Sequence, residues 1–264
     1  MDAELKTLMV KTSGAVVTVT MNRPERKNAA NGTMWRELEE VFTDVATDRT
    51  VRVMVLTGAG GEFCSGADLG DPSDVAGREG DPPLVQMRAL ADVALRLHRL
   101  PKPTIAKVEG VAAGAGMSMA LGCDLVVASS TARFSQIFAR RGLSVDFGAS
   151  WLLPRLIGLH RAKELAFFAD ILSAVEAAEM GLVNRVVPPD ELDDFVEEWA
   201  GRLAEGPPLA LSMTKTLLNN SMGISFDQAL EHESQAQATN FGTADTTEAF
   251  RAFLERRPPN FDGR

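Results

Sequence analysis

The sequence of 264 residues has only two cysteines, Cys64 and Cys123, and no long apolar run. Two cysteines are too few for a disulfide scaffold or a zinc site, so we expect no metal centre. Without about 18 consecutive apolar residues, we expect no membrane span. The 27 basic residues are outnumbered by 36 acidic ones, for a formal net charge of −9. The chain therefore lacks the overall positive charge of a general nucleic-acid binder. A net negative charge still allows a local basic pocket for a phosphorylated ligand.

We expect no targeting signal at either end of the sequence. The first residues, MDAELKTLMVKTSG, contain acids and lack the apolar segment of a signal peptide. The last four, FDGR, differ from the peroxisomal S-K-L. The composition, 45% hydrophobic and 24% charged, is that of an ordinary globular protein. We therefore expect a cytoplasmic α/β enzyme.

Several familiar catalytic motifs are incomplete. Gly114-Ala115-Gly116 lacks the third glycine of a dinucleotide fingerprint, and Ala120 stands where a nucleophile elbow needs its second glycine. The sequence contains no P-loop. Nothing nearby in the sequence completes a catalytic triad or a metal site around any of the three histidines, which lie in predicted helices or at their ends. These histidines are His98, His160 and His232.

Strands and helices alternate in the first half of the chain. β-branched apolar runs predict strands over residues 15–21, 51–57, 104–108 and 124–128. Apolar residues at helical spacing predict helices over 33–47 and 84–100, the second of them ended by Pro101 and Pro103. This alternation favours a mostly parallel sheet flanked by helices.

Helices dominate the second half, where only residues 183–187 read as extended. We expect an α/β core over residues 1–190 and a helical oligomerisation region over 191–264. The stretch 70–83, rich in Gly, Pro and Asp, reads either as a solvated loop or as a lid over a site. The helices are predicted over residues 151–157, 161–169, 174–180, 191–203, 209–219, 226–240 and 246–254.

Two turns of small residues follow predicted strands. One is FCSGADL, residues 63–69, and the other is VAAGAGM, residues 111–117, which opens a short helix. Both lie past the carboxyl ends of strands, where α/β sheets bind ligands. Backbone N–H groups from two facing turns form an oxyanion hole for one oxygen atom. The alternative is that these glycines and alanines serve close helix–sheet packing.

Four segments together resemble the crotonase, or enoyl-CoA hydratase/isomerase, superfamily. The similarity runs from about residue 8 to the C-terminal FLERRPPNF, and the segments occur in the family's order. The resemblance implies an α/β fold built as a spiral of ββα units, with a C-terminal helical region that forms trimers or dimers of trimers. The four segments are NRPERKNA (22–29), FCSGADL (63–69), EGVAAGAGMSMALGCDLVVAS (109–129) and AAEMGLVNRVV (177–187).

The resemblance also assigns an acyl-CoA site. It implies that the N–H groups of Ala67 and Ala115 hold the thioester carbonyl oxygen, and that no separate cofactor is needed because the CoA thioester is the substrate. Lys215 and Phe261 match tail residues that complete a CoA site, sometimes from the next subunit. The other CoA- and substrate-binding positions that the resemblance implies are Lys27, Ala29, Ala67, Asp68, Leu69, Gly114, Ser118 and Phe138. The alternative for Lys27 and Lys215 is a solvated surface lysine without a role in binding.

The catalytic positions depart from the hydratase pattern. Hydratases of the family use two glutamates, and the matching positions here are Ser118 and Phe138. Asp146, in GLSVDFGASWLLPRLIG, matches the aspartate of the family's isomerases, the branch that isomerises ring-epoxides and shifts enoyl double bonds. The alternative for Asp146 is a cap on the following helix.

Isomerisation of an unsaturated acyl-CoA is therefore the predicted reaction. Asp146 removes an α or γ proton, and the enolate is reprotonated at the other end. Three other functions stay open. They are enoyl-CoA hydration in fatty-acid oxidation, hydrolysis or dehalogenation through an aspartate nucleophile, and acyl-CoA binding without catalysis.

Overall fold

A seven-stranded sheet forms the centre of the protein. The computed structural model describes residues 2–70 and 80–264. The strand order is β1-β2-β3-β4-β5-β7-β10; the first three strands pair antiparallel and all later neighbours pair parallel. The strands are β1 (Ala3–Glu4), β2 (Leu8–Ser13), β3 (Val16–Met21), β4 (Val53–Gly58), β5 (Thr104–Val108), β7 (Leu125–Ser129) and β10 (Arg185–Val187).

A second sheet of three short strands lies beside the first. It has the order β6-β8-β9, with β6 (Val111–Ala113), β8 (Arg133–Ser135) and β9 (Leu172–Ser173). The chain alternates between the sheets, because β5 and β7 belong to the large one and β6 and β8 to the small one. The alternation of strands and helices predicts a mostly parallel sheet but gives no sign of this second sheet, because strands of two or three residues are too short to show a period.

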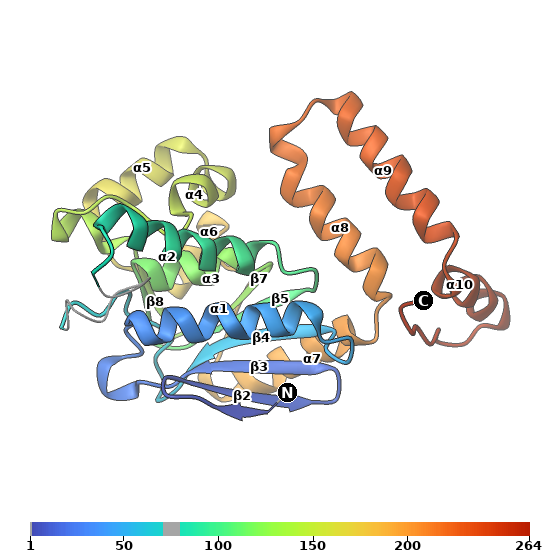
Figure 1. Ribbon diagram of the computed structural model, residues 1–264, viewed down its shortest axis with the longest axis horizontal. Helices are drawn as coiled ribbons and strands as arrows, with labels where there is room; N and C mark the ends of the chain where they lie inside the picture. Colours follow the sequence, from blue (N-terminus) through green and yellow to red (C-terminus); the bar gives the residue numbers. More distant parts are fainter. Residues whose placement is uncertain (1, 71–79) are drawn as a thin grey trace.

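Helices cover one face of the large sheet (Figure 1). In α1 the predicted apolar face is buried, with Met34, Leu38 and Phe42 in the core, and the Asn31 side chain caps the helix by accepting from the Met34 N–H. The helices of this part are α1 (Gly32–Thr47), α2 (Pro83–His98), α3 (Ala115–Gly122), α4 (Ala149–Ile157), α5 (Leu159–Phe168) and α6 (Ala174–Met180), with the short 3₁₀ helices η1 (Pro24–Arg26) and η2 (Ile137–Arg141).

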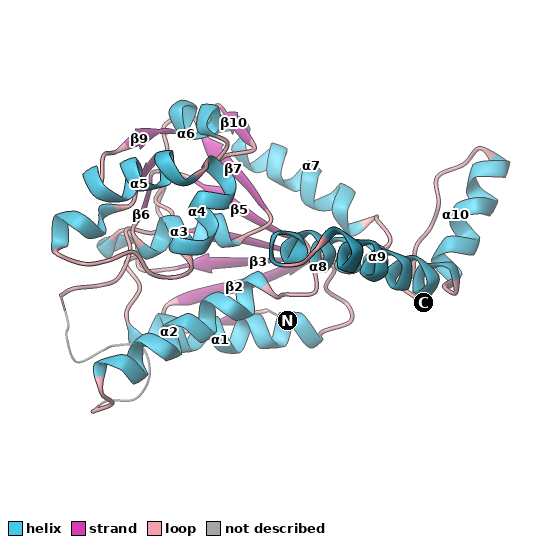
Figure 2. Cartoon of the chain, turned by 90° about the horizontal axis from the view of Figure 1, so that it is seen from above, coloured by secondary structure: helices cyan, strands magenta, loops and turns pink. Residues whose placement is uncertain are grey.

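Helix α7 (Leu192–Ala204) covers the opposite face of the sheet (Figure 2). Its Leu192 and Val196 pack with Val55 and Ile105 of the strands in a separate apolar cluster. The short η3 (Pro189–Glu191) precedes it. Residues 191–204 therefore pack on the α/β part, while the division of the chain at residue 190 stays a prediction.

The last three helices extend away from the sheets (Figure 1). They are α8 (Pro208–Asn220), α9 (Phe226–Phe241) and α10 (Ala244–Glu255), with η4 (Ser221–Gly223) between the first two. Within residues 2–70 and 80–264, no helix is both long and apolar enough to cross a membrane. The predicted loop or lid over 70–83 falls largely on residues 71–79, which lie outside the described residues.

Candidate active site

A buried asparagine holds the first small-residue turn in place. Asn28 is fully buried; its Oδ1 accepts from the N–H of Arg23 (2.9 Å), and its Nδ2 donates to the carbonyl oxygens of Ala59 (2.9 Å) and Glu62 (2.6 Å). The Arg23 guanidinium also pairs with the Asp68 carboxylate at 2.8 Å. These contacts tie the segment after β3 to the turn after β4. Asp68, a predicted CoA contact, therefore has a structural partner in its own chain.

Backbone pairing leaves the N–H of Ala67 without an acceptor. Ala30 donates to the Gly66 carbonyl (2.8 Å) and accepts from the Asp68 N–H (2.9 Å), which makes a parallel bridge to Ala67. A parallel bridge uses the groups of the residues on either side. The Ala67 N–H therefore points away from residue 30 and finds no acceptor among the described residues.

The start of α3 packs directly against the first turn. A Cβ on Gly116 would lie 2.2 Å from the Cys64 carbonyl oxygen, so only glycine allows this backbone contact. The predicted packing role of small residues thus applies to Gly116. Ala115 is the first residue of α3, where an N–H has no intrahelical acceptor.

The two free N–H groups come from adjoining backbone segments. A Cβ on Gly66 would lie 3.0 Å from the Ala113 carbonyl oxygen and 3.8 Å from the Ala115 nitrogen. Like Ala67, Ala115 donates to none of the described residues. Two such donors at neighbouring positions can hydrogen-bond one ligand oxygen and stabilise negative charge on it.

Ser118 and Phe138 are buried beside this pair. The Ser118 hydroxyl donates to the Gly114 carbonyl at 3.1 Å and accepts from Gln136 Nε2 at 3.5 Å. A Cβ on Gly114 would lie 3.7 Å from the Phe138 ring, so the ring packs over this glycine. Ser118 is thus engaged with the backbone, and neither residue offers a carboxylate.

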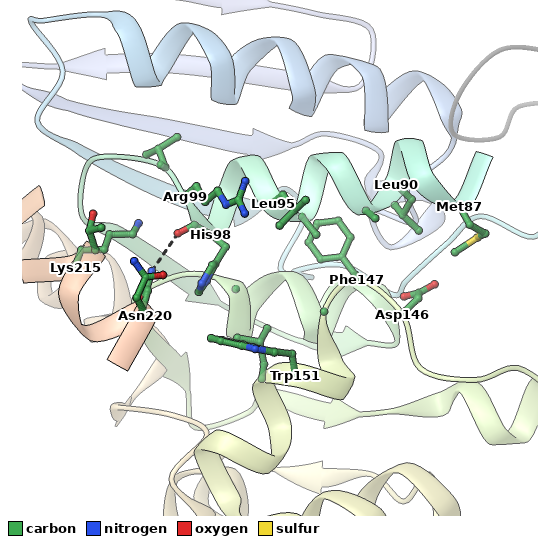
Figure 3. Close-up of a pocket in the computed structure, with 18 residues that line it drawn as sticks. Met87, Leu90, Leu95, His98, Arg99, Asp146, Phe147, Trp151, Lys215 and Asn220 are labelled. Carbon is green, nitrogen blue, oxygen red and sulfur yellow. Dashed lines mark hydrogen bonds between the residues drawn. The ribbon is translucent and has the colours of Figure 1, made fainter. Parts of the chain in front are cut away.

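Asp146 lies at one end of a cavity of about 910 Å³ between α2, α4 and α8 (Figure 3). Its Oδ1 is buried and has no hydrogen-bond partner in the part of the chain that the structure describes. Gly148, not Asp146, is the N-cap of α4, and α4 has no side-chain cap. The alternative role for Asp146, as a cap, is therefore wrong. Of the described residues that line the cavity, Asp146 is the single carboxylic acid.

Burial raises the pKa of Asp146 to about 6. The following residue, Phe147, has a left-handed backbone (φ +49°) and stacks its ring 5.5 Å from Trp35. This anchors the turn and keeps the carboxyl group in an apolar setting. A carboxyl group with such a pKa can both take up and release a proton near neutral pH.

The raised pKa predicts a pH-dependent stability difference for Asp146→Asn. The folded protein binds this proton up to about pH 6, but the unfolded chain releases it near its ordinary value of 3.8. Stability therefore falls as pH rises between these values, and the loss persists above them. The neutral amide of asparagine does not ionise, so the variant does not lose this stability. We expect the variant to be more stable at about pH 8 by about 1–3 kcal/mol, with the gain shrinking toward about pH 4.

Urea unfolding of both proteins across this pH range measures the difference. A gain of equal size at every pH would show that the amide improves packing and that the buried charge is not the cause.

The predicted CoA contacts fall into one group with two outliers. Lys27 is 60% exposed and pairs with Glu62 at 3.0 Å; with Ala29, Asp68 and the exposed Leu69, it surrounds the first turn. Lys215 lies at the far end of the Asp146 cavity, where it pairs with Asp124 at 2.8 Å. Phe261 lines a different, small cavity among the last helices. Neither outlier joins the Lys27 group within one chain.

Sequence reasoning missed the residues that support the turns. Arg23 and Asn28 lie inside the quoted NRPERKNA segment but receive no role from it, and the buried Gln136 was not singled out. Asn28 carried one usable signal, because asparagine tolerates the left-handed backbone (φ +53°) that it adopts here. Nothing in the spacing marks the other two.

Comparisons with known proteins agree on one family. A family model described as enoyl-CoA hydratase/isomerase matches residues 11–264. The chain is 40% identical over 250 residues to the 1,2-epoxyphenylacetyl-CoA isomerase of Escherichia coli K12, covering 94% of this chain and 95% of that protein. It is 38% identical over 256 residues to the short-chain-enoyl-CoA hydratase of Clostridium acetobutylicum, covering 96% of this chain and 97% of that protein.

Solved structures give the same result. The enoyl-CoA hydratase of Bacillus anthracis superposes with a TM-score of 0.92 at 31% identity, covering 98% of this chain and all of that one. A putative enoyl-CoA hydratase of Streptomyces coelicolor A3(2) gives 0.92 at 36% identity, covering 99% and 96%. The predicted crotonase-type fold is confirmed by these matches.

Proposed function

The chain belongs to the enoyl-CoA hydratase/isomerase family, and we propose that it isomerises an unsaturated acyl-CoA with Asp146 as the single acid–base group. The observation that carries this proposal is the carboxyl group itself: Asp146 lines the cavity, and its Oδ1 is buried without a hydrogen-bond partner among the described residues. The isomerase name of the Escherichia coli relative supports it. Other relatives are named hydratases, so the names divide between the two reactions, and the choice of isomerisation rests on the site residues.

The proposed reaction begins with enolate formation. The N–H groups of Ala67 and Ala115 bind the thioester oxygen and stabilise the negative charge that develops there. The Asp146 carboxylate then takes a proton from the α or γ carbon. The resulting carboxylic acid returns a proton to the other end of the conjugated enolate, and the double bond moves without a change in mass.

Hydration is less well supported by the same residues. Addition of water usually calls on two groups, one to activate the water and one to protonate carbon. Ser118 donates its hydroxyl hydrogen to Gly114, and Phe138 is apolar. Asp146 is the one acid of the described cavity lining. A proton shuttle needs only one such group.

Chromatography with mass detection tests the proposal. Incubation with 3-enoyl-CoA should yield the 2-enoyl isomer at unchanged mass. A product heavier by one water from 2-enoyl-CoA would contradict the proposal and identify a hydratase. A covalent adduct on Asp146, detected on the intact protein, would identify the nucleophilic mechanism. Binding of 3-enoyl-CoA and 2-enoyl-CoA without conversion of either would identify an acyl-CoA carrier.

We also propose that the chain assembles as a trimer or a dimer of trimers. The support is the apolar surface of the last helices, where large side chains stay exposed in the single chain. Phe226 of α9 is 77% exposed, and Phe253 and Leu254 of α10 are 82% and 80% exposed. Apolar patches of this kind mark interfaces with other chains.

A further inference from the structure

The cavity that contains Asp146 continues well beyond the carboxyl group. It follows α2 from Met87, near Asp146, to Arg99 at the other end (Figure 3). Twelve helical residues correspond to about 18 Å along the axis. The proton transfer proposed above needs only the first few carbons of an acyl group. The rest of the cavity is available to the part of the substrate remote from the thioester.

The middle of the cavity is apolar. Leu90 and Ala94 of α2 face it from one side, and Phe147 and Trp151 from the other. Figure 3 shows both rings between the two ends of the cavity. Such walls suit methylene groups or a ring, because burying apolar surface against them is favourable. The walls offer no partner to a polar group.

The far end is polar and carries positive charge. Lys215 is neutralised by Asp124 and also donates to the Lys102 carbonyl at 3.0 Å. Asn219 donates to the His98 carbonyl at 3.2 Å, and His98 has its pKa lowered by burial and by Lys215, which favours its neutral form. Arg99 therefore supplies the net charge of this end.

Two exposed groups at this end have donors that no described residue occupies. The Arg99 guanidinium and the Asn220 side-chain amide make no hydrogen bond or ion pair with any described residue, and both line the cavity. A guanidinium presents a planar fork that matches a carboxylate. A carboxylate is therefore the group that the free donors recognise best.

We propose that the substrate is an ω-carboxyacyl-CoA, a dicarboxylic acid bound to CoA at one end, whose free carboxylate binds Arg99 and Asn220. The inference rests on the proposed function for the position of the thioester. The apolar walls hold the chain, Asp146 acts near the thioester, and the far donors select the terminal group.

Matched substrates test this proposal. We compare kcat/KM for 3-dodecenoyl-CoA and for its ω-carboxyl counterpart, with the thioester on the same end. The wild-type protein should prefer the carboxylated substrate about tenfold, the size of one hydrogen bond between charged groups. Arg99→Gln should remove that preference, lowering kcat/KM about tenfold more for the carboxylated substrate than for 3-dodecenoyl-CoA. Arg96→Gln, on the same helix but paired with Glu39, should alter neither.

Binding separates this proposal from the proposed function. Saturated dodecanoyl-CoA and its ω-carboxyl counterpart cannot isomerise, so their Kd values report the far end alone. Tighter binding of the carboxylated analogue, lost in Arg99→Gln, supports the proposal even if neither enoyl substrate turns over. Equal binding of the two analogues, or an equal effect of Arg99→Gln on both, would overturn it while leaving isomerisation intact.

Discussion

Replacing Asp146 with asparagine is expected to lower kcat for isomerisation by about 10²–10⁴-fold, the usual contribution of a general base. The amide has the shape of the carboxyl group but cannot accept the proton. It leaves the backbone N–H pair of Ala67 and Ala115 and the Lys27 region unchanged. Affinity for a saturated acyl-CoA should therefore stay within a few-fold of wild type. Steady-state kinetics and a binding titration on the same preparation measure both quantities.

Asp44→Asn is the matched control for this prediction. Asp44 is an exposed residue of α1, outside the cavity lining. The same chemical change there should leave turnover and stability close to wild type. Turnover of Asp146→Asn at the wild-type rate would remove Asp146 from the mechanism.

Gly116→Ala is expected to have the second-largest effect. Its Cβ would meet the Cys64 carbonyl oxygen at 2.2 Å, and the obstacle is backbone that no rotamer change can move. The start of α3 must shift, and with it the N–H of Ala115. We expect a loss of about 10²–10³-fold in kcat, the usual cost of one misplaced oxyanion donor. Overpacking should cost about 1–3 kcal/mol of stability.

Gly201→Ala controls for the general effect of adding a methyl group. Gly201 lies inside α7 and a Cβ there meets nothing within 4 Å. We expect a gain of about 0.5–1 kcal/mol and normal turnover. Thermal unfolding and kinetics on both variants measure these effects. A folded Gly116→Ala protein with full activity would show that α3 and Cys64 tolerate separation and that the donor pair is unimportant.

The long elements of the fold could be predicted from local pattern. Strand β3 and helix α1 carry strong periodicity, and residues 174–180 form α6 as predicted. The small sheet could not be predicted, because β6, β8 and β9 have two or three residues each and depend on pairing between distant segments. The placement of α7 on the far face of the large sheet is likewise set by tertiary packing.

Parts of the candidate site could also be predicted from the sequence, and other parts could not. The pattern of small residues indicates two turns that could expose N–H groups, but only the family resemblance singles out Ala67 and Ala115. Asp146 follows from the resemblance too, whereas its unpartnered oxygen and raised pKa depend on the surrounding fold. The far end of the cavity, at Arg99, brings together helices α2 and α8. Nothing in the local sequence indicates that contact.

Proton exchange in D₂O tests the central claim most directly, that Asp146 removes a proton from carbon beside the thioester. The protein is incubated with 3-enoyl-CoA in D₂O, and the recovered enoyl-CoA pool is analysed by mass spectrometry and NMR. Our account predicts deuterium at the α and γ carbons with the wild-type protein and none above background with Asp146→Asn. Equal incorporation by both proteins would contradict it, because carbon-bound protons would then exchange without the Asp146 carboxylate.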